Sequence, residues 1–212
     1  MTTREPSPEA AREAALQSLG LDGQDSEAII DALLARLALA QALATFDPLT
    51  GTWQRGAILG QLDQAHARAM RDGRPLGVMQ LAVRYFGDHQ TPEDDPIGTQ
   101  VLQAVSARLR DTLRGGDAIG RVAGNRFLCL LEACDITAAS MVAERCRRAI
   151  TDLPVSLNEG SLTLVRAEAG LVMVHPNAEI GADIILEQAD LLLAQSAAHD
   201  GHPVAVKVLA PD

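Results

Sequence analysis

Residues 114–127 read Arg-Gly-Gly-Asp-Ala-Ile-Gly-Arg-Val-Ala-Gly-Asn-Arg-Phe, and this stretch decides the fold. Its pair of glycines at 115–116 is a turn signal, and mostly apolar runs over 118–122 and 127–133 lie on either side of residues 123–126. Two short apolar runs separated by a few turn residues are typical of a β-hairpin. We therefore expect strands over 118–122 and 127–133, joined by a four-residue turn in which Gly124 supplies the unusual backbone angle.

Helices and strands alternate on both sides of this hairpin. Before it, the hydrophobic pattern predicts a helix over 54–72 that ends at Gly73, a strand over 76–83 and a helix over 98–113. After it, the pattern predicts a helix over 136–151, a strand over 161–174, a helix over 179–198 and a strand over 204–209. This order indicates an α/β fold in which helices cover a sheet.

The first 45 residues have a different organisation. We expect a helix over 7–19, a break at 20–23, and a second helix from residue 25 or 26 to about 44. Apolar residues of the second helix follow the a/d spacing of a helical seam, namely Ile30, Leu33, Leu37, Ala40 and Ala44. The helix is either packed on its own domain or part of a parallel coiled-coil stalk. Residues 1–45 are therefore an N-terminal helical extension, and residues 46–212 form the main domain.

Composition bounds the class of protein. The chain has 212 residues, 47% of them hydrophobic and 2% aromatic, and a net charge of −10, which disfavours a surface for DNA or RNA. Three cysteines suggest a reducing compartment rather than a disulfide framework. The N-terminus lacks the apolar run of a signal peptide, and no apolar stretch is long enough to cross a membrane. We expect a soluble, cytoplasmic protein with no membrane contact.

The hairpin resembles the signature of the GGDEF family, the diguanylate cyclases. Residues 123–127, Ala-Gly-Asn-Arg-Phe, stand where the family has Gly-Gly-Asp/Glu-Glu-Phe, and residues 47–55 resemble its opening Asp-x-Leu-Thr-Gly-Leu-x-Asn-Arg. The resemblance covers about residues 46–209. It implies a nucleotidyl-cyclase palm-like α/β sandwich with a mostly antiparallel sheet, an Asp47–Arg55 ion pair, and a homodimer joined through the N-terminal helices.

The catalytic positions of the family are altered. Diguanylate cyclases place Mg²⁺ on carboxylates, because this ion prefers anionic oxygen ligands. The matching metal-ligand positions here are Ala82 and Asn125, the turnover glutamate is Arg126, and the second strand-end aspartate is Arg84. Substrate-binding positions are altered too, at Gln90, Thr99 and Ala197. We therefore expect no metal, no cofactor and no cyclase activity.

The inhibitory site of the family is retained. In the family, an Arg-x-x-Asp motif and an arginine on the helix after the hairpin bind cyclic di-GMP, and Arg114, Asp117 and Arg145 match these positions. Guanidinium groups fork onto phosphate or guanine, and a carboxylate accepts from guanine N–H groups. We expect Gly115 and Gly116 to let the backbone turn tightly. Taken singly, each residue also fits an ordinary helix end.

These features give three hypotheses. The first is a non-catalytic cyclic di-GMP receptor that signals to an unidentified downstream protein. The second is a ligand-free pseudoenzyme scaffold that binds another protein. The third, a residual cyclase or GTP-binding regulator, requires carboxylates that positions 82 and 125 do not supply.

Overall fold

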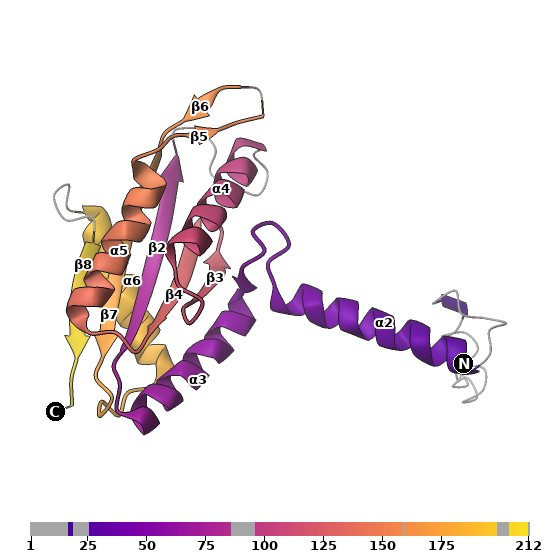
Figure 1. Ribbon diagram of the computed structural model, residues 1–212, viewed down its shortest axis with the longest axis horizontal. Coiled ribbons are helices and arrows are strands. Elements are labelled where there is room, and N and C mark those ends of the chain that lie inside the picture. The colour runs from indigo at the N-terminus through magenta and orange to yellow at the C-terminus, as the bar shows by residue number, and fades with distance from the viewer. Residues whose placement is uncertain (1–16, 19–25, 86–95, 159, 199–203, 212) are drawn as a thin grey trace, which may run out of the picture. The chain divides into compact units, whose positions relative to one another are not determined.

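The computed structural model describes residues 17–18, 26–85, 96–158, 160–198 and 204–211 (Figure 1). Residues Met1–Leu43 and Ala44–Asp212 form two units. The helix expected over 7–19 lies outside the described residues apart from Gln17 and Ser18, which are helical. The break expected at 20–23 also lies outside them. Among the described residues, every helix is too short or too polar to span a lipid bilayer.

The N-terminal unit is described mainly through helix α2, Ser26–Thr45, which forms where the spacing predicts a helix. Its large apolar side chains are exposed: Ile30 by 57%, Leu33 by 41%, Leu34 by 59% and Leu37 by 54%. An exposed apolar stripe of this kind is typical of a surface that packs against another helix or protein. Its role as a coiled-coil seam stays a prediction.

The second unit is built on a six-stranded sheet with the order β1-β3-β4-β2-β7-β8. Its strands are β1 (Trp53–Gln54), β2 (Leu76–Tyr85), β3 (Ala118–Ala123), β4 (Arg126–Glu132), β7 (Val165–Val174) and β8 (Val204–Leu209). Strands β3, β4, β2 and β7 pair antiparallel, whereas β1 and β8 run parallel to their neighbours. The expected mostly antiparallel central sheet is confirmed.

Helices cover both faces of this sheet (Figure 1). Helices α4 (Pro96–Thr112) and α5 (Ile136–Thr151) pack on one face, and α3 (Arg55–Asp72) and α6 (Ala182–Ala198) pack on the other. Side chains of β2 alternate between the two cores, since successive residues of a strand point to opposite faces. The strand is therefore apolar along most of its length, as a strand buried on both sides must be.

Two glycines allow helices to lie close to the sheet. A Cβ atom on Gly120 of β3 would lie 2.5 Å from Cβ of Ile58 in α3. A Cβ atom on Gly170 of β7 would lie 2.5 Å from the backbone nitrogen of Leu193 in α6. Carbon atoms in contact are normally about 3.5–4.0 Å apart. The missing side chains therefore set the distance between the sheet and both helices.

Helix ends follow the expected signals. Helix α3 ends at Gly73, which has a φ of 64° and donates its N–H to Ala69 O. Helix α5 begins after Asp135, whose carboxylate accepts from Ala138 N at 2.7 Å. The bounds of α5 and β8 agree with the ranges predicted from the sequence.

The β3–β4 hairpin forms as expected, but its turn is shorter. Strand β3 extends to Ala123 and β4 starts at Arg126, so only Gly124 and Asn125 form the turn. Gly124 does not have a positive φ, so the backbone role expected for it is wrong. Instead, the strand register shifts between Arg121 and Ala123, and such a bulge bends the strand without glycine.

The strand expected over 161–174 is divided in two. Its first part, β6 (Leu162–Thr163), pairs with β5 (Val155–Ser156) in a separate two-stranded sheet. The second part, β7, begins at Val165 and joins the main sheet. The sequence analysis missed β5, because two residues are too few for a periodic pattern.

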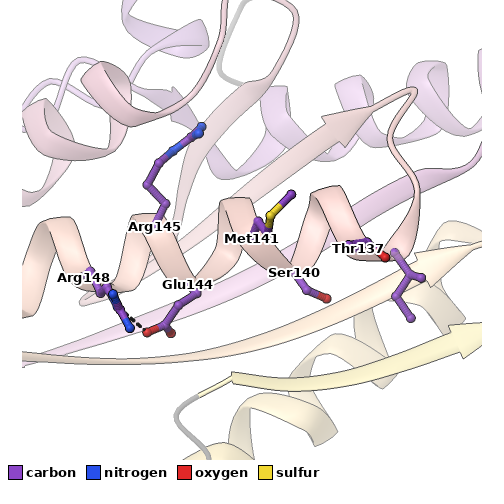
Figure 2. Close-up of a pocket in the computed structure, with 7 residues that line it drawn as sticks. Thr137, Ser140, Met141, Glu144, Arg145 and Arg148 are labelled. Carbon is purple, nitrogen blue, oxygen red and sulfur yellow. Dashed lines mark hydrogen bonds and ion pairs between the residues drawn. The ribbon is translucent and has the colours of Figure 1, made fainter.

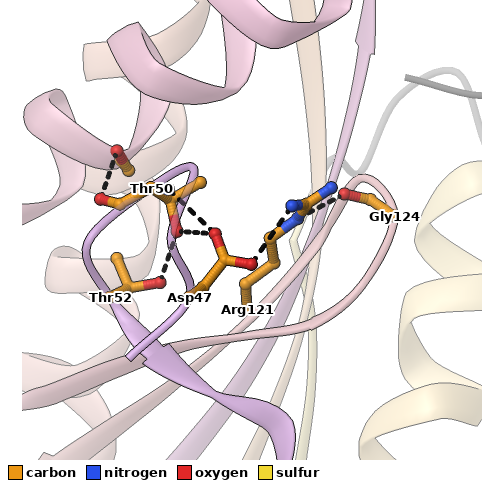
Figure 3. Close-up of polar contacts among 6 residues, drawn as sticks. Asp47, Thr50, Thr52, Arg121 and Gly124 are labelled. Carbon is orange, nitrogen blue, oxygen red and sulfur yellow. Dashed lines mark hydrogen bonds and ion pairs between the residues drawn. The ribbon is translucent and has the colours of Figure 1, made fainter. Parts of the chain in front are cut away.

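Asp47 is paired differently from the family expectation (Figure 3). Its carboxylate accepts from Thr50 N at 2.8 Å and Thr50 Oγ1 at 2.6 Å, and Oδ2 lies 3.2 Å from Nη1 of Arg121. Arg121 also donates from Nε to Gly124 O at 2.8 Å. Arg55 donates to Val122 O instead of pairing with Asp47. The expected Asp47–Arg55 pair is wrong, and Asp47 joins the loop before β1 to the hairpin.

The close approach at Gly170 predicts opposite effects for two glycine substitutions. In Gly170→Ala, the new methyl group pushes the backbone of α6 away from β7, which should lower the free energy of unfolding by about 1–3 kcal/mol. Gly60→Ala, in the interior of α3 with no atom within 4 Å of its Cβ position, should raise it by up to about 1 kcal/mol. Urea unfolding of the full chain measures both, and equal effects would contradict this packing.

The Asp47 contacts predict a loss of stability in Asp47→Asn. The neutral amide weakens the bond to Arg121, whose side chain is 8% exposed, and should cost about 2–3 kcal/mol. Asp63→Asn, at an exposed position of α3, is the control and should change stability by less than about 0.5 kcal/mol. Thermal unfolding of both variants tests this, and a stable Asp47→Asn protein would show that the pair is dispensable.

Candidate functional site

Three of the residues that the sequence analysis matched to catalytic positions of the family meet where β2 approaches the hairpin turn. Ala82 of β2 lies in register with Arg126 of β4 on one side and Glu168 of β7 on the other. Asn125 donates from Nδ2 to Val83 O at 2.6 Å, and Val83 N donates back to Asn125 O at 3.0 Å. The asparagine amide thus uses a main-chain oxygen that would otherwise be open to a ligand at this strand end.

The arginines at this end of the sheet bind carboxylates of the protein itself. Nε of Arg84 lies 3.5 Å from Oε2 of Glu168, and Nη1 of Arg126 lies 3.0 Å from Oδ1 of Asp190 in α6. In the parts of the chain that the structure describes, no three acidic, histidine or cysteine side chains gather to hold a metal ion.

The remaining substrate positions lie on other elements. Thr99 is in the first turn of α4 and is half-buried, and Ala197 is exposed near the end of α6. Gln90 lies outside the described residues. The structure therefore brings together Ala82, Asn125 and Arg126, with Arg84 two residues farther along β2.

The Arg-x-x-Asp motif forms a turn after α4. Asp117 donates its N–H to Arg114 O at 2.9 Å, with Gly115 and Gly116 between them. Neither glycine has a positive φ. Arg114 donates from N and Nε to the Asp117 carboxylate at 3.2 and 3.3 Å, and from Nη2 to Glu132 O. The Arg114 side chain is 59% exposed and that of Asp117 is 2% exposed, so the guanidinium covers the carboxylate.

Arg145 reaches the same corner of the fold from α5. Its Nη2 donates to Thr112 O at 2.7 Å, and Thr112 is the last residue of α4, two positions before Arg114. Among the described residues, no carboxylate pairs with the Arg145 guanidinium. The end of α4, the turn at 114–117 and the middle of α5 thus form one corner that contains two surface guanidinium groups and one covered carboxylate.

An open groove of about 800 Å³ lies along α5 beside this corner (Figure 2). Its lining residues all come from this helix and are Ile136, Thr137, Ser140, Met141, Glu144, Arg145 and Arg148. In Figure 2, Arg145 and Met141 extend from one side of the helix, and Glu144 and Arg148 extend from the other. Met141 is 64% exposed and Ile136 is 43% exposed, so the groove combines apolar surface with guanidinium groups.

Glu144 binds two of the three arginines in the middle of α5. Its carboxylate accepts from Arg147 at 2.7 and 2.8 Å and from Arg148 at 2.8 Å. The hydrogen bond from Arg147, followed by the one from Arg148, lowers the pKa of Glu144 to about 2, although burial acts in the opposite direction. The carboxylate therefore stays charged and holds both arginines, whereas within the described part of the chain the Arg145 guanidinium has a main-chain partner alone.

The sequence analysis missed most of the groove. Ile136, Ser140, Glu144 and Arg148 follow one another at intervals of four residues, as do Thr137, Met141 and Arg145. Residues four apart share a face of a helix. The signal was therefore present in the spacing, but apolar residues on an exposed helix face are common and did not indicate a groove.

The three cysteines do not form a site among the described residues. Cys129, Cys134 and Cys146 are free thiols. Burial raises the pKa of Cys146 to about 12 and that of Cys129 well above its usual range. Neither thiol ionises near neutral pH, and both lie in the core between the sheet and α5, Cys129 on β4 and Cys146 on α5.

Comparison with known proteins places this geometry in a family. The profile described as "Diguanylate cyclase, GGDEF domain" matches residues 44–202. The chain is 34% identical over 164 residues to the diguanylate cyclase DgcP of Pseudomonas aeruginosa, covering 76% of this chain and 24% of that protein. It is 30% identical over 173 residues to the cyclic di-GMP phosphodiesterase NbdA of the same organism, covering 80% and 22%. The chain thus spans about a quarter of the length of these relatives.

Solved structures show the same fold. The coiled coil and GGDEF domain of DgcB from Caulobacter crescentus, in complex with c-di-GMP, matches with a TM-score of 0.74 at 20% identity, covering 93% of this chain and all of that one. The diguanylate cyclase SiaD of P. aeruginosa, in complex with its activator SiaC, matches with a TM-score of 0.68 at 25% identity, covering 94% and 75%. On the match over three quarters of its length, the chain belongs to the GGDEF domain family.

Proposed function

We propose that this protein is a non-catalytic receptor for cyclic di-GMP, which it binds through Arg114, Asp117 and Arg145. Gly115 and Gly116 form the backbone of the turn that presents the first two residues. The observation that carries the proposal is the contrast between two sites. The strand end that family members use for catalysis has no carboxylate at Ala82, Asn125 or Arg126, whereas the corner at the end of α4 keeps its charged groups.

The loss of catalysis rests on the chemistry of the strand end. Mg²⁺ needs hard anionic oxygen ligands, and a neutral alanine and asparagine do not supply them. A positive charge at Arg126 would repel a divalent cation further. The hydrogen bond from Asn125 to Val83 O also occupies the adjacent main-chain acceptor.

Retained ligand binding rests on charge. The net charge of −10 repels an anionic dinucleotide unless guanidinium groups gather locally. Arg145 donates to a main-chain oxygen and pairs with no carboxylate of the described residues, and Arg114 shares its guanidinium between Asp117 and Glu132 O. Both side chains therefore have donors to offer to phosphate or guanine. The related DgcB domain has been solved in complex with c-di-GMP, which supports the choice of ligand.

Ligand binding requires Arg114 to move. The guanidinium covers Asp117, whose side chain is 2% exposed, so guanine reaches the carboxylate only after Arg114 swings outward. The guanine N–H groups of the ligand then replace Arg114 as donors to the buried Asp117 carboxylate, so that this charge keeps its hydrogen bonds. Binding therefore exchanges an internal ion pair for contacts to the ligand and changes the surface beside the α5 groove.

Signal output is proposed to run through dimerisation and a downstream protein. The exposed apolar stripe on α2 supports a parallel coiled coil with a second copy of the chain. The second candidate function is a ligand-free scaffold for another protein. It is favoured by Ile136 and Met141, whose exposed side chains give the α5 groove an apolar floor suited to a protein contact.

The receptor proposal predicts saturable binding of cyclic di-GMP to the full chain in calorimetry, with a Kd of about 1 μM or lower. Arg114→Ala should raise the Kd at least about tenfold, since hydrogen bonds to charged groups contribute about 1.5–3 kcal/mol. Arg84→Ala is the matched control, because its side chain is 60% exposed against 59% for Arg114 and it lies on β2. No heat at high ligand concentration would reject the receptor and leave the scaffold.

The same proposal predicts no cyclase activity. Incubation of the full chain with GTP and Mg²⁺ should give no cyclic di-GMP by chromatography, because no carboxylate stands at positions 82 and 125 to hold the metal. A diguanylate cyclase assayed in parallel controls for substrate and detection. Product formed by this chain, and lost in Asn125→Ala, would show that a neutral amide suffices as a ligand and would refute the proposal.

A further inference from the structure

A second, smaller pocket lies on the other face of the sheet. It has a volume of about 80 Å³ and is lined by residues of α3, β2, β3, β4 and α6. Its polar groups are Arg55, Gln80, Arg126 and Asp190, and its apolar wall includes Leu59 and Leu186. None of these residues lines the α5 groove or belongs to the turn at 114–117.

The charges of this pocket favour an anion. Arg55 donates to Val122 O at 3.2 Å and makes no ion pair within the described part of the chain. Arg126 pairs with Asp190, but the two side chains are 48% and 50% exposed, and a pair so open to water is weak. Two guanidinium groups and one carboxylate leave a positive excess on a chain whose net charge is −10.

Gln80 places a buried carboxamide in the wall of this pocket. The residue is 4% exposed, and among the described residues its buried Oε1 accepts no hydrogen bond. Buried amides almost always have partners, because losing water without replacement costs free energy. A carboxamide can present either its oxygen or its NH₂ group, according to what it meets. The side chain is thus placed to complete a site when a ligand enters.

The N-terminus of α3 adds to the positive charge at this pocket. This helix of 18 residues begins at Arg55, has no acidic residue in its first turn and receives no side-chain cap from Gln54. The N-terminus of a helix carries a partial positive charge that an anion normally balances. Arg55 increases this charge instead of balancing it.

We propose that the pocket binds a phosphate-sized oxyanion, as inorganic phosphate or as the phosphate group of a phosphomonoester. Oxygens of the anion accept from Arg55 and Arg126, and its remaining oxygen or hydroxyl meets the Gln80 carboxamide. Asp190 competes with the ligand for Arg126 and is displaced on binding. Arg126, at the position where the family has a turnover glutamate, thereby gains an anion-binding role.

The test is a calorimetric titration of inorganic phosphate into the full chain at low ionic strength, with GMP as a second ligand. Arg55→Gln and Arg126→Gln should each weaken phosphate binding at least about tenfold, and Asp190→Asn should strengthen it about threefold. Arg84→Gln is the control, because its guanidinium pairs with Glu168 outside the pocket and should leave the Kd unchanged. Circular dichroism checks that each variant is folded.

The outcomes separate the possibilities. Equal affinities for phosphate and GMP identify the free anion, and tighter binding of GMP with the same pattern of variants identifies a phosphomonoester. No saturable binding, or binding that Arg55→Gln and Arg126→Gln leave unchanged, overturns the proposal and leaves a pocket that holds water. Cyclic di-GMP binding should be unaffected by these variants, so the result is independent of the receptor proposal.

Discussion

The pairing of β2 with both of its neighbours is the constraint on which the rest of the molecule depends. Strand β2 lies in register with β7 over ten residue pairs and with β4 over seven. This register fixes which residues are neighbours at the end of the strand. Ala82 lies between Arg126 and Glu168, and Asn125 donates to Val83 O. The same pairing separates two apolar cores and so decides that α4 and α5 share one face and α3 and α6 the other.

The two faces carry different electrostatic arrangements. On the α5 side, Glu144 holds Arg147 and Arg148, and Arg145 donates to a main-chain oxygen and to no carboxylate of the residues that the structure describes. On the α3 side, the weak Arg126–Asp190 pair and the buried Gln80 carboxamide surround a small pocket. In both places, the arginines that can bind a ligand are those that do not already form a strong ion pair with a carboxylate of the protein. The total number of arginines says little, because arginines are common on helices.

Local patterns predicted the elements well, and long-range partners poorly. The bounds of α5 and β8 were predicted from apolar spacing, and in the structure the bond from Ala138 N to Asp135 caps the start of α5. The sequence did not predict that Asp47 pairs with Arg121, because the two residues are 74 positions apart and no local pattern connects them. The shape of the hairpin turn was also missed, since a bulge beside Arg121 depends on strand register rather than on residue type. The α5 groove could not be predicted either, because apolar spacing does not tell whether another element packs on that face of the helix.

The most direct test of the account is a crystal structure of the full chain grown with cyclic di-GMP, GTP and Mg²⁺ present together. The account predicts cyclic di-GMP at the end of α4, with the Arg114 guanidinium moved off Asp117 and Glu132 O onto the ligand, and Arg145 moved off Thr112 O. It predicts no metal at the end of β2. GTP with coordinated Mg²⁺ beside Ala82 and Asn125, and an Arg114 that still covers Asp117, would contradict it.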